Sequence, residues 1–246
     1  MDGLILAIES SGDLGGAALL EKGTLVGEEL VSGPRKHGGE LMPCVDRLFV
    51  KHKVAREALA VIAVNAGPGS YTGLRIGLMT AAALGFALDK PVIGVSAFDC
   101  MALQLVMSRG FDTRYKGEIW PALDARRDEL MTAKFVFEKG DLKRIGGDEL
   151  IAPAEFSKHA APGSIVFGSG VAPYENVLKP QPLKLSEPKL EINPGTVAIQ
   201  AWRELVNTPD AKAIKRAPVE PRYFRPVLAK TTEERASASG VGRVAD

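Results

Sequence analysis

The sequence is poor in the residues that bind metals and form disulfides. Its 246 residues include two cysteines, Cys44 and Cys100, and three histidines. No histidine has a second histidine or a cysteine three to five residues away, so no zinc-type spacing is present. Two cysteines inside apolar helical patterns also give no disulfide framework. These absences argue against a metal centre and favour a reducing, cytoplasmic environment.

The sequence also lacks an excess of charge of either sign. Lysine and arginine number 31 against 30 acidic residues, a formal net charge of +1. Such a balance gives no general attraction to nucleic acid or to an anionic membrane. No apolar run approaches the length of a membrane-spanning helix, and no basic stretch precedes an apolar segment at the start. We therefore expect a soluble globular chain that is long enough for one large or two modest domains.

What is present is an alternation of short apolar strands and helical patterns. Three strands are expected first, then a helix, a strand, a helix, a strand and a helix, which predicts a mixed sheet flanked by helices. A second block follows a polar segment at 110–117 and ends in a helix entered through Asn193 and Pro194. We predict subdomains at 1–109 and 110–226 and a disordered tail at 227–246. The expected strands are 4–8, 16–20, 24–30, 60–64, 91–95, 119–123, 130–137, 142–145 and 164–167, and the expected helices are 38–53, 72–88, 97–107 and 196–206.

The most informative motif is the glycine-rich loop at 67–73, Gly-Pro-Gly-Ser-Tyr-Thr-Gly, between a predicted strand and a predicted helix. A loop of this kind can point free N–H groups and the positive end of the helix dipole at an anion. Its spacing fits neither the dinucleotide fingerprint nor the P-loop. Two interpretations stay open, a tight structural turn and a phosphate site. The candidate anion or nucleotide contacts are Gly67, Gly69, Ser70 and Thr72.

The helix that follows the loop carries small residues every four positions, at Gly73, Gly77, Ala81 and Gly85. Each glycine in a helix costs about 1 kcal/mol relative to alanine, so a close contact is expected along this stripe. One interpretation is internal packing. The other is a subunit interface built from this helix and the helix at 38–53.

Other candidate residues give weaker signals. His37 stands at a helix entry, where it could cap the helix or contact a ligand. Ser70 and Thr72 have no histidine next to them in sequence to activate a nucleophile. Arg126 and Arg127 lie in a charged hairpin connection and could contact phosphate or a carboxylate. The basic aromatic segment at 221–226 suits a partner contact, a nucleic-acid contact or a C-terminal strap.

Six segments carry a resemblance to a known family. They are LILAIESS at 4–11, HGGELMP at 37–43, GPGSYTGLRIG at 67–77, PVIGVS at 91–96, LDARR at 123–127 and PRYFR at 221–225. Together they resemble the bacterial TsaB (YeaZ) family, the dimerisation subunit of the tRNA threonylcarbamoyladenosine machinery. The glycine loop with the Leu-Arg-Ile-Gly after it is the most specific part. The family commonly has aspartate where this chain has Glu9.

The resemblance implies an α/β fold of the actin and sugar-kinase type (ribonuclease-H-like), shared with the catalytic paralogue TsaD. The two metal-binding histidines of that paralogue match Ala97 and Met101 here, and neither supplies the required ligand. The resemblance therefore implies a non-catalytic scaffold subunit that needs no cofactor of its own, with ATP and metal on its partners. It also implies a partner contact through the first two helices. The candidate interface residues are His37, Leu41, Val45, Gly73, Gly77, Ala81 and Gly85.

The implied partners are a TsaD-like transferase in a heterodimer, a TsaE-like ATPase, and tRNA reached through the complex. A homodimer of the chain alone is left open. Two alternatives from other classes remain. One is an enzyme, either an ATP-dependent sugar-kinase-like phosphotransferase or an M22-type glycoprotease-like metallopeptidase. The other is a direct RNA-binding module, which the near-neutral charge disfavours.

Overall fold

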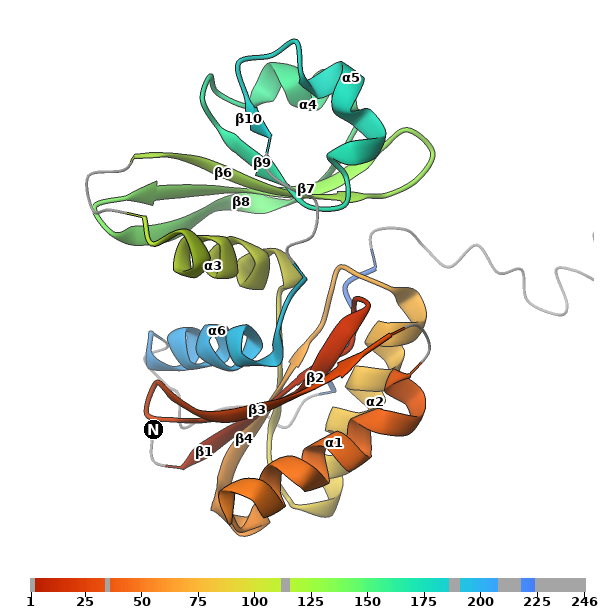
Figure 1. The fold of residues 1–246 in the computed structure, drawn as a ribbon, viewed down its shortest axis with the longest axis vertical. Helices are drawn as coiled ribbons and strands as arrows, with labels where there is room; N and C mark the ends of the chain where they lie inside the picture. The colour runs from red at the N-terminus through yellow and green to blue at the C-terminus, as the bar shows by residue number, and fades with distance from the viewer. Residues whose placement is uncertain (1–2, 34–35, 112–115, 186–190, 208–217, 224–246) are drawn as a thin grey trace, which may run out of the picture.

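The computed structural model describes residues 3–33, 36–111, 116–185, 191–207 and 218–223. These residues form two lobes, each built on a five-stranded mixed sheet, with helices α3 and α6 between the two sheets (Figure 1). The predicted class, mixed sheets flanked by helices in a ribonuclease-H-like arrangement, is confirmed. None of the helices in this described part is long and apolar enough to cross a membrane.

The first sheet is organised around strand β1. Its order is β3-β2-β1-β4-β5, with β1 antiparallel to β2 and parallel to β4. All six residues of β1 are buried because both faces of the sheet are covered, which is why its sequence is continuously apolar. Leu6 and Ile8 enter the core under α1 and α2, and Ile5 and Ala7 enter the core under α6. The strands are β1 (Leu4–Glu9), β2 (Leu14–Glu21), β3 (Thr24–Ser32), β4 (Leu59–Asn65) and β5 (Val92–Val95).

The helices of the first lobe lie in two layers. Helices α1 and α2 pack side by side on one face of the sheet, and α6 covers the other (Figure 1). Asn193 is the N-cap of helix α6, and its side chain accepts a hydrogen bond from the Thr196 N–H at 2.7 Å, so the predicted helix entry is confirmed. The helices are α1 (His37–His52), α2 (Tyr71–Ala87) and α6 (Pro194–Val206), with a short 3-10 helix η1 (Arg56–Ala58) before β4.

The second sheet has the order β10-β9-β6-β7-β8. Helix α3 covers one face, where Phe98 and Leu105 pack with Phe135 and Phe137. Helices α4 and α5 cover the other face around Trp120. The elements are α3 (Ala97–Arg109), β6 (Gly117–Asp124), β7 (Leu130–Glu138), β8 (Asp141–Ile151), α4 (Pro153–His159), β9 (Ile165–Phe167), η2 (Ala172–Tyr174), α5 (Glu175–Leu178) and β10 (Lys184–Leu185).

The predicted subdomain bounds, 1–109 and 110–226, stay a prediction, and two helices pack across the boundary between them. Helix α3, placed in the first subdomain, contributes to the core of the second sheet. Helix α6, placed in the second, packs on the first sheet. The segment 218–223 also belongs to the first lobe, since the Arg222 N–H donates to the Ala66 carbonyl at 2.8 Å and Val219 packs on the core. The tail predicted to be disordered, 227–246, lies outside the described residues.

Candidate functional site

The glycine loop joins β4 to α2, and its backbone donors are used within the chain. The Gly67 N–H donates to Asn65 Oδ1 at 2.9 Å, and the Ser70 N–H donates to the Ser11 carbonyl at 2.8 Å. The Gly73 N–H donates to Ser70 Oγ at 3.3 Å, which makes Ser70 the N-cap of α2. The N–H groups of Gly67 and Ser70 therefore hold the turn and are not free for an anion, and an anion contact through the Ser70 hydroxyl stays a prediction.

The other two proposed anion contacts differ in position. A Cβ at Gly69 would lie 2.7 Å from the Cβ of Ser11, so this glycine lets the loop approach the β1–β2 turn. Thr72 is exposed in the first turn of α2. The interpretation of the loop as a tight structural turn explains the observed contacts, and an anion role for Gly69 and Thr72 stays a prediction.

A buried carboxylate stands behind the loop. Glu9 is 1% exposed, and its Oε1 accepts the Ser11 N–H at 2.5 Å. Its Oε2 accepts a hydrogen bond from Asn65 Nδ2 at 2.7 Å, and the same amide nitrogen lies 2.9 Å from Ser11 Oγ. Burial raises the pKa of Glu9, and the hydrogen bonds from Ser11 and Asn65 oppose that rise. The network ties β1, the β1–β2 turn and the glycine loop together. Sequence reasoning missed Asn65 because nothing in the local pattern joins it to Glu9.

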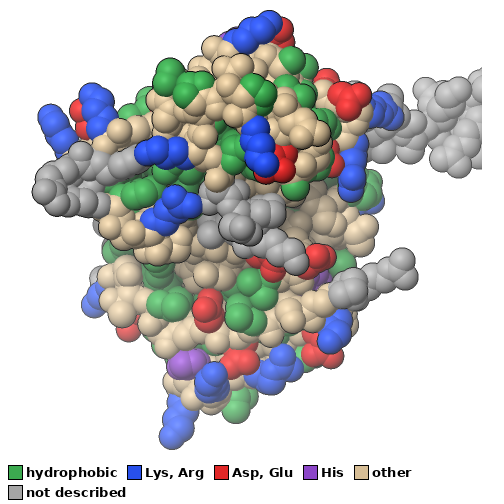
Figure 2. Space-filling view, turned by 45° about the horizontal axis from the view of Figure 1, so that its top comes forward, with side chains coloured by type: hydrophobic (Ala, Val, Ile, Leu, Met, Phe, Trp, Pro, Cys, Tyr) green, Lys and Arg blue, Asp and Glu red, His purple; other side chains and the backbone are tan. Residues whose placement is uncertain are grey.

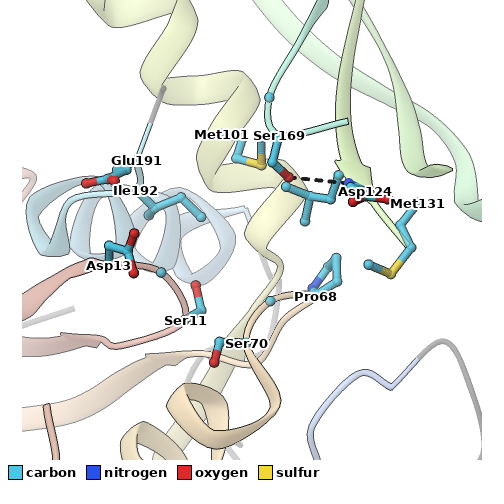
Figure 3. A pocket seen from close by; sticks show the side chains of 14 residues that line it. Ser11, Asp13, Pro68, Ser70, Met101, Asp124, Met131, Ser169, Glu191 and Ile192 are labelled. Carbon is cyan, nitrogen blue, oxygen red and sulfur yellow. Dashed lines mark hydrogen bonds between the residues drawn. The ribbon is translucent and has the colours of Figure 1, made fainter. Parts of the chain in front are cut away.

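A cleft lies between the lobes, directly above the loop, with a volume of about 470 Å³ (Figure 3). The first lobe contributes the β1–β2 turn and the glycine loop, and the second lobe contributes the end of β6 and the β9–η2 turn. Its only charged lining residues are three carboxylates, with no lysine, arginine or histidine among the described lining side chains. The lining residues are Ser11, Gly12, Asp13, Pro68, Gly69, Ser70, Met101, Leu123, Asp124, Met131, Gly168, Ser169, Glu191 and Ile192.

The predicted interface stripe on α2 faces the sheet. A Cβ at Gly73 would overlap the Ser10 carbonyl oxygen, one at Gly77 would overlap Ser10 Oγ, and one at Gly85 would lie 2.5 Å from Val92 Cγ2. Ala81 is fully buried. The small residues thus let α2 approach β1, β4 and β5 closely, and the internal-packing interpretation holds. Direct partner contact through this stripe is corrected.

The predicted α1 contacts are also internal. Leu41 and Val45 are each 1% exposed in the core beneath α1. His37 is 6% exposed, and its Nε2–H donates to the Gly12 carbonyl at 2.9 Å. The ring packs over Gly15, where a Cβ would lie 2.6 Å from it. The His37 side chain does not cap α1. It packs against the β1–β2 turn.

The outer surfaces of these helices carry the exposed apolar groups. We define the outer face of α2 as Arg75, Met79, Ala82, Ala83 and Phe86, all exposed. Phe86 is 92% exposed and Met79 is 73% exposed. At its start, the Arg75 guanidinium lies 4.7 Å from the centre of the Tyr71 ring, and the Tyr223 ring lies 5.2 Å from the same ring. The segment 221–226 was predicted as a partner contact, a nucleic-acid contact or a strap. Its described residues, 221–223, lie beside the first turn of α2, and 224–226 lie outside the described residues.

The remaining candidates lie at separate positions in the fold. Arg126 and Arg127 lie in the β6–β7 connection, where an Arg126 nitrogen is 3.2 Å from the Asp124 carboxylate. Ala97 and Met101 are buried, and Met101 forms part of the cleft wall. Across the described ranges, no group of three or more His, Cys, Asp or Glu side chains is placed to hold a metal ion.

Sequence reasoning also missed Arg144 on β8. Its guanidinium pairs with Asp99 of α3 and with Asp148, and it lies 3.2 Å from Ser96 Oγ. It also stacks on the Phe135 ring at 5.5 Å. The cluster joins the second sheet to the start of α3. No sequence signal joins it to α3, because Asp99 and Ser96 are 45 and 48 residues away in the chain.

Comparisons with known proteins agree with this geometry. A family model described as "TsaD: tRNA N6-adenosine threonylcarbamoyltransferase" matches residues 31–191. The chain is 35% identical over 152 residues to a Bacillus subtilis "tRNA threonylcarbamoyladenosine biosynthesis protein TsaB", covering 62% of this chain and 63% of that protein. It is 30% identical over 223 residues to an uncharacterized Mycobacterium tuberculosis protein, covering 90% of this chain and 91% of that protein.

A solved structure supports the same relationship. YeaZ from Pseudomonas aeruginosa superposes with a TM-score of 0.73 at 25% identity, covering 90% of this chain and all of that chain. The matches to relatives named TsaB span about half to two thirds of their length, 63% for Bacillus subtilis and 54% for Escherichia coli. The family model covers more than half of the described fold, including the glycine loop, α1 and α2. The chain therefore belongs to the TsaB (YeaZ) family, within the wider family that the TsaD model describes.

Proposed function

We propose that the chain is a non-catalytic scaffold subunit in the biosynthesis of threonylcarbamoyladenosine in tRNA. In this role it pairs with a TsaD-like transferase that modifies the adenosine beside the tRNA anticodon. The relatives named TsaB and the matching TsaD family model support this placement. A TsaE-like ATPase is the further proposed partner, and tRNA is reached through the complex in the cytoplasm. ATP and metal belong to the partners in this proposal.

The observation that carries the proposal is the outer face of α2. Phe86 and Met79 stand 92% and 73% exposed on a helix whose opposite side is packed against the sheet. Met42, which is 42% exposed, adds an apolar group on the neighbouring α1. Large apolar side chains gathered on adjacent helices favour burial against a partner, at about 25 cal/mol for each Å² removed from water. Two helices with such outer surfaces suit a helical pair on the partner.

The chemistry of the cleft supports the proposal that the chain itself is not catalytic. A phosphoryl or nucleotide substrate is held by cationic side chains, metal ions or free backbone N–H groups. The charged side chains of the described cleft lining are three carboxylates, and three of the loop donors are bound inside the chain. Ala97 and Met101 supply no imidazole at the positions that match the paralogue's histidines. These features weigh against the sugar-kinase and metallopeptidase alternatives.

The experiment is complex formation with the TsaD-like transferase of the same organism. We expect a 1:1 complex by size-exclusion chromatography with light scattering. Phe86→Asp and Met79→Asp should each abolish it, because a carboxylate would be buried in an apolar contact. Val177→Asp is the matched control, since Val177 is 40% exposed on α5 of the other lobe. Circular dichroism and melting of each variant confirm folding. Full complex formation by both α2 variants would refute the interface.

The alternatives make different predictions for the isolated chain. Tight magnesium-dependent ATP binding with turnover would support an enzyme. Tight tRNA binding that weakens steeply with salt would support a direct RNA-binding module. Figure 2 shows acidic and basic side chains interspersed over the described surface of that view, with no broad area of one sign. We therefore expect neither result from the chain alone.

A further inference from the structure

We propose that two copies of this chain associate edge to edge through strand β8, in antiparallel order, so that their second sheets become one continuous sheet. Strand β8 ends the order β10-β9-β6-β7-β8, and in the described structure its one hydrogen-bonded neighbour is β7. Its outer side therefore presents backbone N–H and C=O groups with which a further strand can pair. The contact lies in the second lobe and is separate from the outer face of α2, which the proposed function uses.

The other sheet edges in the described structure are poorer places for a second strand. Strands β10 and β5 have only two and four residues. Strand β3 has nine residues, but an antiparallel pair centred on its middle residue would place Glu28 of one copy opposite the same residue of the other. Like charges in opposed positions are destabilising. Strand β8 has eleven residues and contains no proline, so its length and composition permit a long edge contact.

The charges of β8 change sign about its middle. Two basic residues precede Gly146, and two acidic residues follow it at the same distances along the strand. In an antiparallel pair of identical strands centred on Gly146, each basic residue therefore lies opposite an acidic residue of the other copy. The two-fold symmetry of the pair repeats every contact. The opposed pairs are Lys143 with Glu149, Arg144 with Asp148, and Leu142 with Leu150.

The register between β7 and β8 places both members of each opposed pair on the same face of the sheet. Four β8 residues lie opposite β7 residues of the core under α3, namely Leu142, Arg144, Asp148 and Leu150. Lys143 and Glu149 belong to the other face, because their β7 partners alternate with those residues. A shift of one residue between the copies would oppose residues of different faces, and a shift of two would separate both ion pairs. Among these registers, the pairing centred on Gly146 alone satisfies the charges and the faces together.

The two glycines at the centre of β8 support a close approach by a second strand. Gly146 has a φ of 78°, which favours glycine by itself, but Gly147 has no positive φ. A Cβ at either residue would meet nothing within 4 Å in the described chain. Packing within one copy thus gives no reason for glycine at position 147. A strand that crosses the two-fold axis would come close to this backbone, where glycine leaves room for it.

Sedimentation velocity of the full chain over a dilution series tests the proposal. The wild-type chain should shift from monomer to dimer as its concentration rises. Lys143→Glu and Glu149→Lys should each weaken dimerisation about tenfold or more, because each places like charges in both symmetry-related pairs. This pair is chosen because both side chains are exposed, whereas Arg144 and Asp148 also pair within the chain. Lys184→Glu, on β10 at the opposite edge of the same sheet, is the matched control and should dimerise like the wild type.

Charge exchange separates recognition from folding. A double variant that carries both Lys143→Glu and Glu149→Lys should dimerise again. An equimolar mixture of the two single variants should form a mixed dimer, because each opposed pair at these positions then joins a basic and an acidic side chain. A monomeric wild type, single variants that dimerise like the wild type, or a double variant and a mixture that stay monomeric would each overturn the edge contact.

The two proposals can fail separately. Phe86→Asp lies on the outer face of α2 and should leave the β8 dimer intact. Lys143→Glu should still form the complex with the TsaD-like transferase, because the second lobe is not part of that proposed interface. Circular dichroism of every variant verifies that it is folded. Loss of the dimer in Phe86→Asp would show that the two copies meet through α2 and would overturn the edge contact.

Discussion

The substitution Gly77→Ala tests the close packing of α2. On an exposed helix this change stabilises by about 1 kcal/mol. Here the new Cβ would overlap Ser10 Oγ and lie 3.5 Å from Val64 Cγ2. The Ser10 hydroxyl also donates to the Gly73 carbonyl at 2.8 Å, so moving it removes a buried hydrogen bond. Gly77→Ala should therefore destabilise the protein if the side of α2 that faces the sheet is tightly packed, and stabilise it if that side is not.

The magnitude follows from opposing contributions. Overpacking costs about 1–3 kcal/mol, and loss of the Ser10 hydrogen bond costs about 1 kcal/mol. The gain in helix propensity offsets about 1 kcal/mol of this. We expect a net loss of about 1–3 kcal/mol in the free energy of unfolding. For a chain of this size, each kcal/mol lowers Tm by about 2–4 °C.

The assay is urea and thermal unfolding monitored by circular dichroism, with Gly39→Ala as the matched control. Gly39 lies in α1, and a Cβ there meets nothing within 4 Å, so this variant should gain stability by about 0.5–1 kcal/mol. The two glycine-to-alanine changes should thus have opposite signs. A Gly77→Ala variant as stable as Gly39→Ala would refute the packing role of the stripe.

Three further predictions concern stability. Because burial raises the pKa of Glu9 above 4.5, its protonation supports the folded state at low pH, and this contribution is lost as pH rises through the folded pKa. Subtracting the Glu9→Gln stability from the wild-type value across pH should show that decline, whereas a flat difference would contradict the buried-carboxylate assignment. Arg144→Met should lower the free energy of unfolding by about 1–2 kcal/mol, because it removes the contacts with Asp99 and Asp148. In the same urea titration, the control Lys143→Met, at an exposed position, should stay within about 0.5 kcal/mol of wild type. Asn193→Ala should lower the free energy of unfolding by about 1 kcal/mol, because it removes the N-cap hydrogen bond of α6. An unchanged Tm would show that this hydrogen bond contributes nothing to stability.

Local signals in the sequence predicted the elements of the first lobe, whereas α4, α5 and β10 of the second lobe were not predicted. The polar, glycine-containing sequence Glu21-Lys22-Gly23 predicted a hairpin turn. The structure confirms it, since Lys22 and Gly23 adopt φ values of 48° and 84°, as a two-residue hairpin requires. Helices α1 and α2 follow from apolar residues at helical spacing. Their start residues are within one position of the prediction. These features depend on neighbours within about one helical turn, which the sequence displays directly.

Long-range pairing was the part that local patterns could not supply. Helix α6 has an apolar face, but nothing in its sequence says that this face covers β1 and not the adjacent second sheet. The cleft brings together Asp13, Asp124 and Glu191, three residues with no common motif. The Glu9–Asn65 pair spans 56 positions. Each of these depends on the order of strands in the sheet, and the same element order is compatible with several such arrangements.

The glycine stripe shows why the face of a helix must be known before its function is assigned. Small residues at four-residue spacing predict close approach, but the approach can be to a sheet or to a partner. Here the sheet contacts Gly73, Gly77 and Gly85, so the large side chains on the other side, Met79 and Phe86, are the groups left for a partner. A change on the inner face should therefore weaken a partner complex only as far as it destabilises the fold. A change at Phe86 should weaken the complex with the fold intact, and measuring both quantities on both variants separates packing from recognition.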